Sequence, residues 1–288
     1  MTLQSSDDVV VADVMTAMPD RDFAANRARG RIALAVAATS SVTRRRRVHE
    51  SGSLRVRFPG PPAPELEAVI VNTAGGLTGG DAFAIDIAVE QDARLVVGTA
   101  AAEKIYRSLG PPATVDIAIK VDAGAALDWL PQETILFDQA ALHRRIAVDL
   151  AETARLCLVE SLVFGRTGMG EAVEQGRVSD CWRIRRNGRL IYAEGTRLSG
   201  DISRTLAEPA VADGGVAIAT ALVVPADAAA ADAIHAISGE FRGEVGVSAW
   251  NGHALLRFCA RDGAILRHDV ARALAVLRAA PLPRLWIN

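Results

Sequence analysis

The feature that most constrains the fold is a long succession of short β-prone runs that begins near Arg31. Leu54–Phe58, Phe83–Val89 and Val115–Val121 are such runs, and glycine, proline and aspartate separate them. The connections are too short to hold the helices that join parallel strands in a doubly wound sheet. The sequence therefore predicts a mainly β fold.

Two of these runs alternate apolar and polar residues, which is typical of strands with one buried face. Ile117, Ile119 and Val121 fall on one side of their run, and Phe83–Val89 places its odd positions in the same way. Asn187-Gly188 lies between two further β-prone runs and favours a tight hairpin turn. We expect an antiparallel pair there.

Helical patterns appear late in the chain. Asp227–Ile237 is rich in alanine, and Asp269–Ala279 carries apolar residues three to four positions apart. These segments predict about two helices toward the C-terminus. Residues 1–27 show no sustained period and are expected to form a flexible tail, which leaves residues 28–288 as a single domain.

Charge and cysteine usage narrow the possible functions. A formal net charge of −2 disfavours nucleic acid or an anionic membrane as partner. Arg44–Arg47 is a basic exception in a strand-like segment, where alternate side chains would face opposite sides, so we expect a solvated edge strand or a partner patch. The three cysteines lack a C-x-x-C pair, and the apolar runs are too short to span a bilayer. We expect a cytoplasmic protein.

The most distinctive motif is Asn72–Asp81, which contains four glycines. Glycines let the backbone adopt positive φ angles and approach a neighbour closely. No Gly-Lys-Ser/Thr follows, and a β run rather than a helix comes next, so neither a P-loop nor a dinucleotide fingerprint fits. On glycine count alone, a tight turn is favoured over a ligand cradle.

Three further segments mix carboxylates, basic groups and aromatics: Glu103–Ser108, Trp129–Asp138 and Glu160–Glu171. Taken singly, each is typical of a surface salt-bridge cluster. Together and in this order, however, the motifs Ala-Gly-Gly-Leu-Thr-Gly-Gly-Asp, Lys-Ile-Tyr-Arg-Ser, Trp-Leu-Pro-Gln-Glu-Thr and Gly-Arg-x-x-Met-Gly-Glu resemble the UreD (UreH) family of urease accessory proteins. The resemblance runs from about Arg31 to Trp286, with Ala100 replacing a frequent glutamine.

The resemblance implies a β-helix-like stack of strands and a maturation factor rather than an enzyme. Family members bind UreF and, through it, the nickel-carrying GTPase UreG. The complex docks on apo-urease and helps to deliver nickel to a site with a carbamylated lysine. A water-filled passage through the protein is the proposed route, so nickel would be cargo and no tightly bound cofactor is expected.

The residue types bear on this role. Tight nickel sites favour clustered imidazole and thiolate ligands, whereas the five histidines here are scattered. A passage favours isolated carboxylates that bind weakly enough to release the ion. We predict Asp81, Glu160 and Glu171 as weak transit ligands. Glu160 is the most informative because it lies in an apolar run, although a salt bridge to Arg166 or another basic group is the alternative.

Tyr106, Arg107, Trp129 and Phe137 are predicted to bind a partner, because aromatic and guanidinium groups are enriched at binding hot spots. The alternative is that these aromatics belong to the core.

The rival from another class is a β-helical carbohydrate-active enzyme, with Glu133 and Asp138, or Glu160 and Glu171, as acid and base. Four Trp and two Tyr are few for lining a glycan groove. The chain lacks the phosphate-binding lysine expected of a nucleotide enzyme. It also lacks the Gly-x-Ser-x-Gly elbow expected of a hydrolase.

Overall fold

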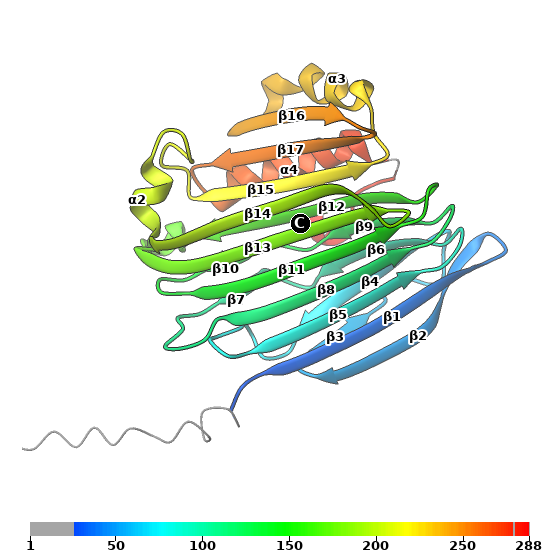
Figure 1. The fold of residues 1–288 in the computed structure, drawn as a ribbon, viewed down its shortest axis with the longest axis horizontal. Coiled ribbons are helices and arrows are strands. Elements are labelled where there is room, and N and C mark those ends of the chain that lie inside the picture. The colour runs from blue at the N-terminus through cyan, green and yellow to red at the C-terminus, as the bar shows by residue number, and fades with distance from the viewer. Residues whose placement is uncertain (1–25, 279, 288) are drawn as a thin grey trace, which may run out of the picture.

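Two β-sheets packed face to face form the body of the protein (Figure 1). The computed structural model describes residues 26–278 and 280–287, so the tail predicted for residues 1–27 lies almost wholly outside the described residues. In the seven-stranded sheet the strand order is β14-β13-β11-β8-β5-β1-β2. Its strands are β1 (Arg29–Thr39), β2 (Val42–Gly52), β5 (Ala82–Val89), β8 (Ala113–Val121), β11 (Ala141–Leu150), β13 (Gln175–Arg186) and β14 (Arg189–Asp201).

The ten-stranded sheet follows the order β16-β17-β15-β12-β9-β6-β4-β3, with β10 beside β12 and β7 beside β10. Its strands are β3 (Leu54–Arg57), β4 (Glu65–Asn72), β6 (Arg94–Thr99), β7 (Glu103–Ile105), β9 (Ala126–Leu130), β10 (Thr134–Leu136), β12 (Arg155–Phe164), β15 (Ala217–Val224), β16 (Glu244–Trp250) and β17 (His253–Ala260).

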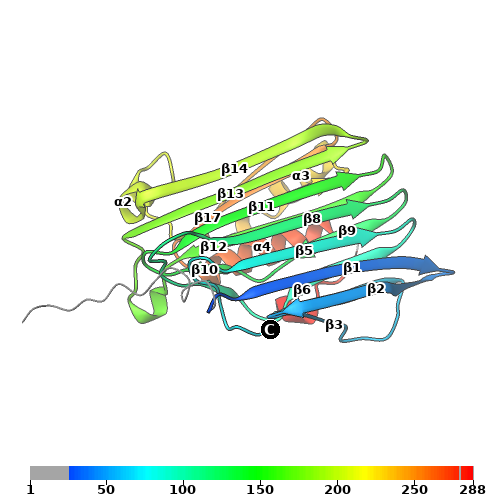
Figure 2. The same cartoon turned by 60° about the horizontal axis from the view of Figure 1, so that its bottom comes forward.

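The chain alternates between the sheets from β4 to β13, so each coil contributes strands to both. In the seven-stranded sheet, β1, β5, β8, β11 and β13 pair in parallel and run side by side (Figure 2). Parallel neighbours need a crossover, and here a strand of the other sheet serves in place of a helix. The predicted β-helix-like stack is confirmed.

The core lies between the sheets because each central strand turns its apolar positions inward. Ile117, Ile119 and Val121 of β8 are buried, as are the odd positions of Phe83–Val89 in β5. The two predicted alternations are therefore confirmed. Parallel registry places like residues side by side, for example Ile85 beside Ile117.

Features at both edges of the seven-stranded sheet match the sequence. Asn187 and Gly188 have positive φ angles and join the antiparallel strands β13 and β14. β2 is an edge strand, and all of Arg44–Arg47 is exposed. Arg46 forms an ion pair with Glu90 at 3.2 Å. The predicted solvated edge strand is confirmed.

The helices are α2 (Ile202–Ala207), α3 (Ala228–Ala236), α4 (Gly263–Leu277) and α5 (Arg284–Ile287). Asp227 caps α3 as its carboxylate accepts from the Ala229 N–H at 3.0 Å. The prediction that the last long helix begins at Asp269 was wrong, because Asp262 caps α4 and accepts from the Ile265 N–H. Asp269 lies inside α4, buried, and accepts from the backbone N–H groups of Arg242 and Gly243, which directly precede β16.

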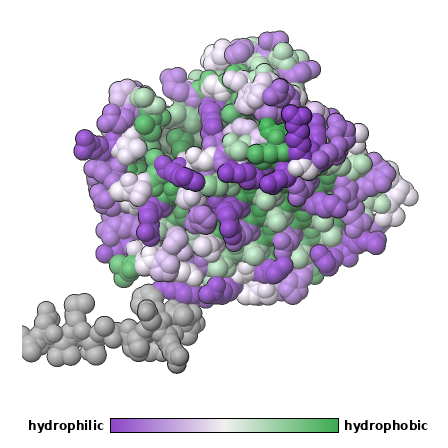
Figure 3. Space-filling model, in the orientation of Figure 1, coloured by the Kyte–Doolittle hydropathy of each residue, from purple (hydrophilic) through white to green (hydrophobic). Residues whose placement is uncertain are grey.

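α3 and α4 cover the outer face of β15, β17 and β16, where a second apolar cluster forms. On the outer face of the seven-stranded sheet, charged side chains lie scattered among apolar ones (Figure 3). Ala84, Ala118 and Ala147 flank an ion pair there, between Arg145 and Asp116, of 2.6 Å. In the part of the chain that the structure describes, no helix is long and apolar enough to cross a membrane.

Candidate functional site

Four loops at one edge of the stack carry most of the sequence motifs. We call residues 73–81, 106–112, 137–140 and 165–174 the motif edge; each loop leads from the ten-stranded to the seven-stranded sheet. The opposite edge consists of short turns, such as residues 122–125. Motifs far apart in the sequence meet because successive coils place equivalent loops on top of one another.

Backbone hydrogen bonds join these loops into one layer. The Tyr106 N–H donates to the Leu77 carbonyl at 2.7 Å. The Ser108 N–H donates to the Gln139 carbonyl at 3.0 Å, and the Gln139 N–H donates to the Gln175 carbonyl at 2.8 Å. Backbone hydrogen bonds between successive coils therefore hold the motif edge together, as they do in the sheets.

The glycine motif serves close packing within the motif edge. A Cβ at Gly76, whose φ is +150°, would lie 2.4 Å from Cε2 of Tyr106, and a Cβ at Gly79 would lie 2.0 Å from Oγ of Ser108. The Tyr106 hydroxyl donates to the Gly75 carbonyl at 3.2 Å. The glycine loop and the Lys-Ile-Tyr-Arg-Ser segment thus fit each other, which supports the tight-turn interpretation.

Asp81 closes the glycine loop from inside. Its carboxylate accepts from the backbone N–H of Thr78 at 2.7 Å and from that of Ala28 at 2.8 Å. The residue is buried. Asp81 therefore ties the loop to the start of β1, and its proposed role toward nickel remains a prediction.

Glu171 forms an ion pair with Arg166 at 2.5 Å. The Arg166 guanidinium lies over the Phe137 ring at 4.4 Å, and that ring packs edge-on against Tyr106 at 4.8 Å. The carboxylate that Arg166 holds is thus Glu171, whereas the alternative above paired it with Glu160.

Three large apolar or aromatic side chains project from the motif edge. Tyr106 is 37% exposed, Leu109 76% and Met169 72%. Arg107 beside them is exposed too. We did not single out Leu109 or Met169 from the sequence, although each is a large apolar residue next to a glycine in one of these loops.

Between the sheets lies a buried ion cluster formed by Arg144, Asp180 and Glu160. Arg144 and Asp180 are neighbours on β11 and β13, whereas Glu160 reaches across from β12. The Arg144 guanidinium donates to Asp180 through Nε at 3.1 Å and Nη2 at 2.5 Å, and to Glu160 Oε2 through Nη1. The basic partner of Glu160 is therefore Arg144, and the cluster joins the two sheets.

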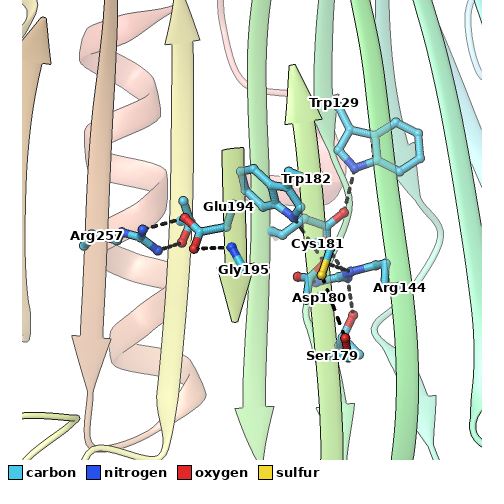
Figure 4. A network of polar contacts seen from close by, with 12 residues as sticks. Trp129, Arg144, Ser179, Asp180, Cys181, Trp182, Glu194, Gly195 and Arg257 are labelled. Carbon is cyan, nitrogen blue, oxygen red and sulfur yellow. Dashed lines mark hydrogen bonds and ion pairs between the residues drawn. The ribbon is translucent and has the colours of Figure 1, made fainter. Parts of the chain in front are cut away.

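Two tryptophans complete the cluster (Figure 4). The Trp129 indole Nε1 donates to Glu160 Oε1 at 2.8 Å, and the Trp182 indole Nε1 donates to Asp180 at 3.2 Å. Trp129 is only 2% exposed. Its side chain thus contacts Glu160 inside the protein, which places it apart from Tyr106, Arg107 and Phe137 at the motif edge.

The charges of the cluster do not balance, because one guanidinium faces two carboxylates. Burial raises the pKa of Glu160 to about 7, although Arg144 lowers it. The two carboxylates together raise the pKa of Arg144. The two pKa shifts agree if Arg144 stays charged and a proton on Glu160 removes the surplus negative charge. Glu160 takes the proton because it accepts one hydrogen bond from Arg144, whereas Asp180 accepts two.

This pKa shift predicts a pH-dependent stability. Below the ordinary Glu value of 4.5, Glu160 is protonated in both folded and unfolded states. Above it the unfolded chain releases the proton while the folded chain retains it, so the free energy of unfolding falls as the pH rises to about 7, by at most roughly 1.4 kcal/mol per pH unit. Glu160→Gln should remove this part of the pH dependence of the free energy of unfolding, measured by urea unfolding at several pH values. Parallel curves for wild type and variant would contradict the raised pKa of Glu160.

A cavity of about 70 Å³ adjoins the cluster between the sheets. Apolar side chains line most of it, and its polar lining includes Glu160, Arg144, Thr134, Gln132 and Glu103. Burial raises the pKa of Glu103, which accepts from the Asn72 amide at 2.9 Å. The volume is sufficient for about two water molecules.

The predicted transit ligands are not assembled into one metal site. Asp81 and Glu171 belong to the motif edge, whereas Glu160 lies within β12. Within residues 26–278 and 280–287, no three His, Cys, Asp or Glu side chains are grouped to hold a metal ion. The arrangement offers separate oxygen ligands, which suits weak binding.

The carboxylate pairs considered for glycan cleavage have other partners. Glu133 forms an ion pair with Arg267 at 3.1 Å, and Asp138 accepts from the Gln175 N–H at 2.9 Å. Glu160 is buried whereas Glu171 lies at the motif edge. All four carboxylates are therefore engaged by other groups of the protein.

Comparisons with known proteins agree with one another. A family model described as UreD urease accessory protein matches residues 28–287. The chain is 58% identical to "Urease accessory protein UreD" of Rhodopseudomonas palustris (strain BisA53) over 266 residues, which cover 92% of this chain and 93% of that protein. It is also 58% identical to "Urease accessory protein UreD" of Bradyrhizobium diazoefficiens, with 92% and 96% covered. The matched range includes the whole motif edge and the buried cluster.

Proposed function

The chain belongs to the UreD family of urease accessory proteins, and from this premise we propose that it works with UreF and UreG on apo-urease to deliver nickel. The proposed route is a water-filled passage that includes the cavity between the two sheets. Nickel is cargo in this scheme, and the chain itself performs no catalytic step.

The observation that carries the proposal is the polar lining of that cavity. Glu160 and Glu103 bring carboxylates into an otherwise apolar interior, next to the hydroxyl of Thr134 and the amide of Gln132. Buried carboxylates are unfavourable unless water, a partner or a cation stabilises them. Arg144 and Trp129 engage Glu160, Asn72 engages Glu103, and water in the cavity would solvate both carboxylates further.

Weak binding follows from the contacts that the carboxylates already make. Both oxygens of Glu160 are engaged, by Trp129 and by Arg144. A nickel ion must displace one of these donors, which lowers its affinity and lets it leave again. The same argument applies to Asp81 with its two backbone donors and to Glu171 with Arg166.

We assign partner binding to the motif edge. Tyr106, Arg107 and Phe137 lie there, and exposed Leu109 and Met169 add apolar area. Aromatic, arginine and methionine side chains are enriched at interface centres. UreF is the proposed partner of this surface, with UreG bound through UreF.

Glu160→Gln tests the transit role. The amide preserves the shape of the side chain and leaves Arg144 paired with Asp180, so folding and co-purification with UreF should persist. Nickel-dependent urease activation should fall, by about tenfold, because a neutral amide attracts a divalent cation less strongly than a charged carboxylate does. Glu160→Ala should impair activation in the same way, but it should lose more stability because removing the side chain leaves a void.

The matched control is Glu152→Gln, which makes the same change at a turn of the opposite edge, where Glu152 accepts from the Asn187 amide. This variant should activate urease normally. Loss of UreF binding in Glu160→Gln would instead make Glu160 a structural residue.

A further inference from the structure

One wall of the cavity between the sheets has an unpaired polar group. Gln132 lines the cavity and is 8% exposed, and its Nε2 atom is buried without a hydrogen-bond partner. A buried amide donor without an acceptor destabilises the fold. An apolar residue at this position would avoid the unpaired donor. The presence of Gln132 therefore points to an occupant of the cavity that accepts from Nε2, such as water.

The other end of the same amide faces outward. Oε1 of Gln132 accepts from Nη1 of Arg267 in α4 at 2.5 Å, and Nη1 also contacts Glu133 at 3.1 Å. Arg267 and Glu133 line a hollow of about 490 Å³, together with Val163, Arg166, Asp262 and Gly263. The Gln132–Arg267 hydrogen bond thus lies between an internal cavity and a second, more open hollow.

The wall is irregular at this point. Residues 131–133 connect β9 and β10 and belong to neither strand. The Gln132 N–H donates to the Thr99 hydroxyl at 2.9 Å instead of to a strand partner. The Gln132 N–H is therefore held by a side chain and lies outside the sheet ladder.

Arg267 also ties the C-terminal segment to this wall. Its Nη2 donates to the Leu285 carbonyl at 2.5 Å, and its guanidinium lies over the Trp286 ring at 5.2 Å. The Trp286 indole donates to the Leu130 carbonyl at 3.0 Å. The position of Arg267, and with it the Gln132 bond, therefore depends on how α4 and the C-terminal segment are seated.

We propose that Gln132 is the gate between the internal cavity and the hollow at α4, and that Arg267 holds this gate closed. The inference rests on the proposed function, because the species that passes is a partly hydrated divalent cation. Rotation of the Gln132 amide away from Arg267 joins the two spaces, and its carbonyl oxygen then becomes available to the ion as a ligand.

The test uses preassembled complexes of the chain with UreF, UreG and apo-urease, and follows the rate at which urease activity appears after nickel is added. Gln132→Leu fills the same space but offers no ligand and no polar surface, and it should slow activation by about tenfold. Gln132→Ala removes the obstruction and should activate at the wild-type rate or faster. Gln91→Leu, the same change in a turn of the opposite edge, should have no effect.

The order of the rates separates a gate from a structural residue. A structural role makes Gln132→Ala the poorest variant, because it loses the Arg267 bond and leaves a void. An alanine variant slower than wild type therefore overturns the gate, even if Gln132→Leu does not assemble. A leucine variant that assembles and activates at the wild-type rate overturns it as well. If the wild-type chain itself does not promote activation, the proposed function fails instead.

Discussion

Arg144→Met is expected to lower the free energy of unfolding by about 3–5 kcal/mol, which is the usual loss when one partner of a buried ion pair is removed. The reason is that Glu160 and Asp180 would remain between the sheets without a cation. Since Glu160 can take up a proton, the loss should be smaller at about pH 5 than at about pH 8. Urea unfolding followed by tryptophan fluorescence measures it, because Trp129 and Trp182 contact the cluster.

The matched control is Arg145→Met on the same strand. Arg145 faces solvent and forms an ion pair with Asp116, so its loss should change stability by less than about 1 kcal/mol. The triple variant Arg144→Met, Glu160→Gln, Asp180→Asn removes every charge of the cluster and should recover most of the loss. Equal effects of Arg144→Met and Arg145→Met would show that the cluster does not stabilise the fold as described.

Gly76→Ala is expected to destabilise the motif edge by about 2–5 kcal/mol, the sum of backbone strain and overpacking. The new Cβ would lie 2.4 Å from the Tyr106 ring and 2.8 Å from the Lys104 carbonyl, with a φ of +150°. The loop must therefore move away from Tyr106, and UreF binding at this surface should weaken with it. Thermal unfolding and co-purification with UreF measure the two effects.

Gly75→Ala is the control in the same loop. Gly75 also has a positive φ, +77°, but a Cβ there meets nothing within 4 Å. It should lose only the backbone preference, about 1 kcal/mol. If both variants behave alike, the close fit between the glycine loop and Tyr106 is not what holds the motif edge.

Much of the fold was predictable because local patterns and tertiary structure agree. The alternation in β5 and β8 identified their buried faces, and Asn187-Gly188 identified the β13–β14 hairpin. The parallel stacking of coils followed only from the family resemblance, since alternation fixes which side of a strand is buried but not which strand lies beside it.

The candidate site was predictable only in part. Glu160 stood out as a carboxylate in an apolar run. Arg144 and Asp180 were missed because the β-prone runs evident in the sequence, Ile146–Leu150 and Cys181–Arg185, begin after them. Extending the alternation of Ile146 and Val148 back by one step would have placed Arg144 on the buried face. The pairing across the sheets depends on contacts between distant segments, and spacing along the chain does not encode these.

The measurement that tests the central claim most directly is urease activation with purified components. Apo-urease, UreF and UreG are incubated with nickel, GTP and bicarbonate, with and without the chain, and urease activity is measured over time. The account predicts that the chain co-purifies with UreF and that activation depends on its presence. Equal activation with and without the folded chain would contradict the proposed role in nickel delivery.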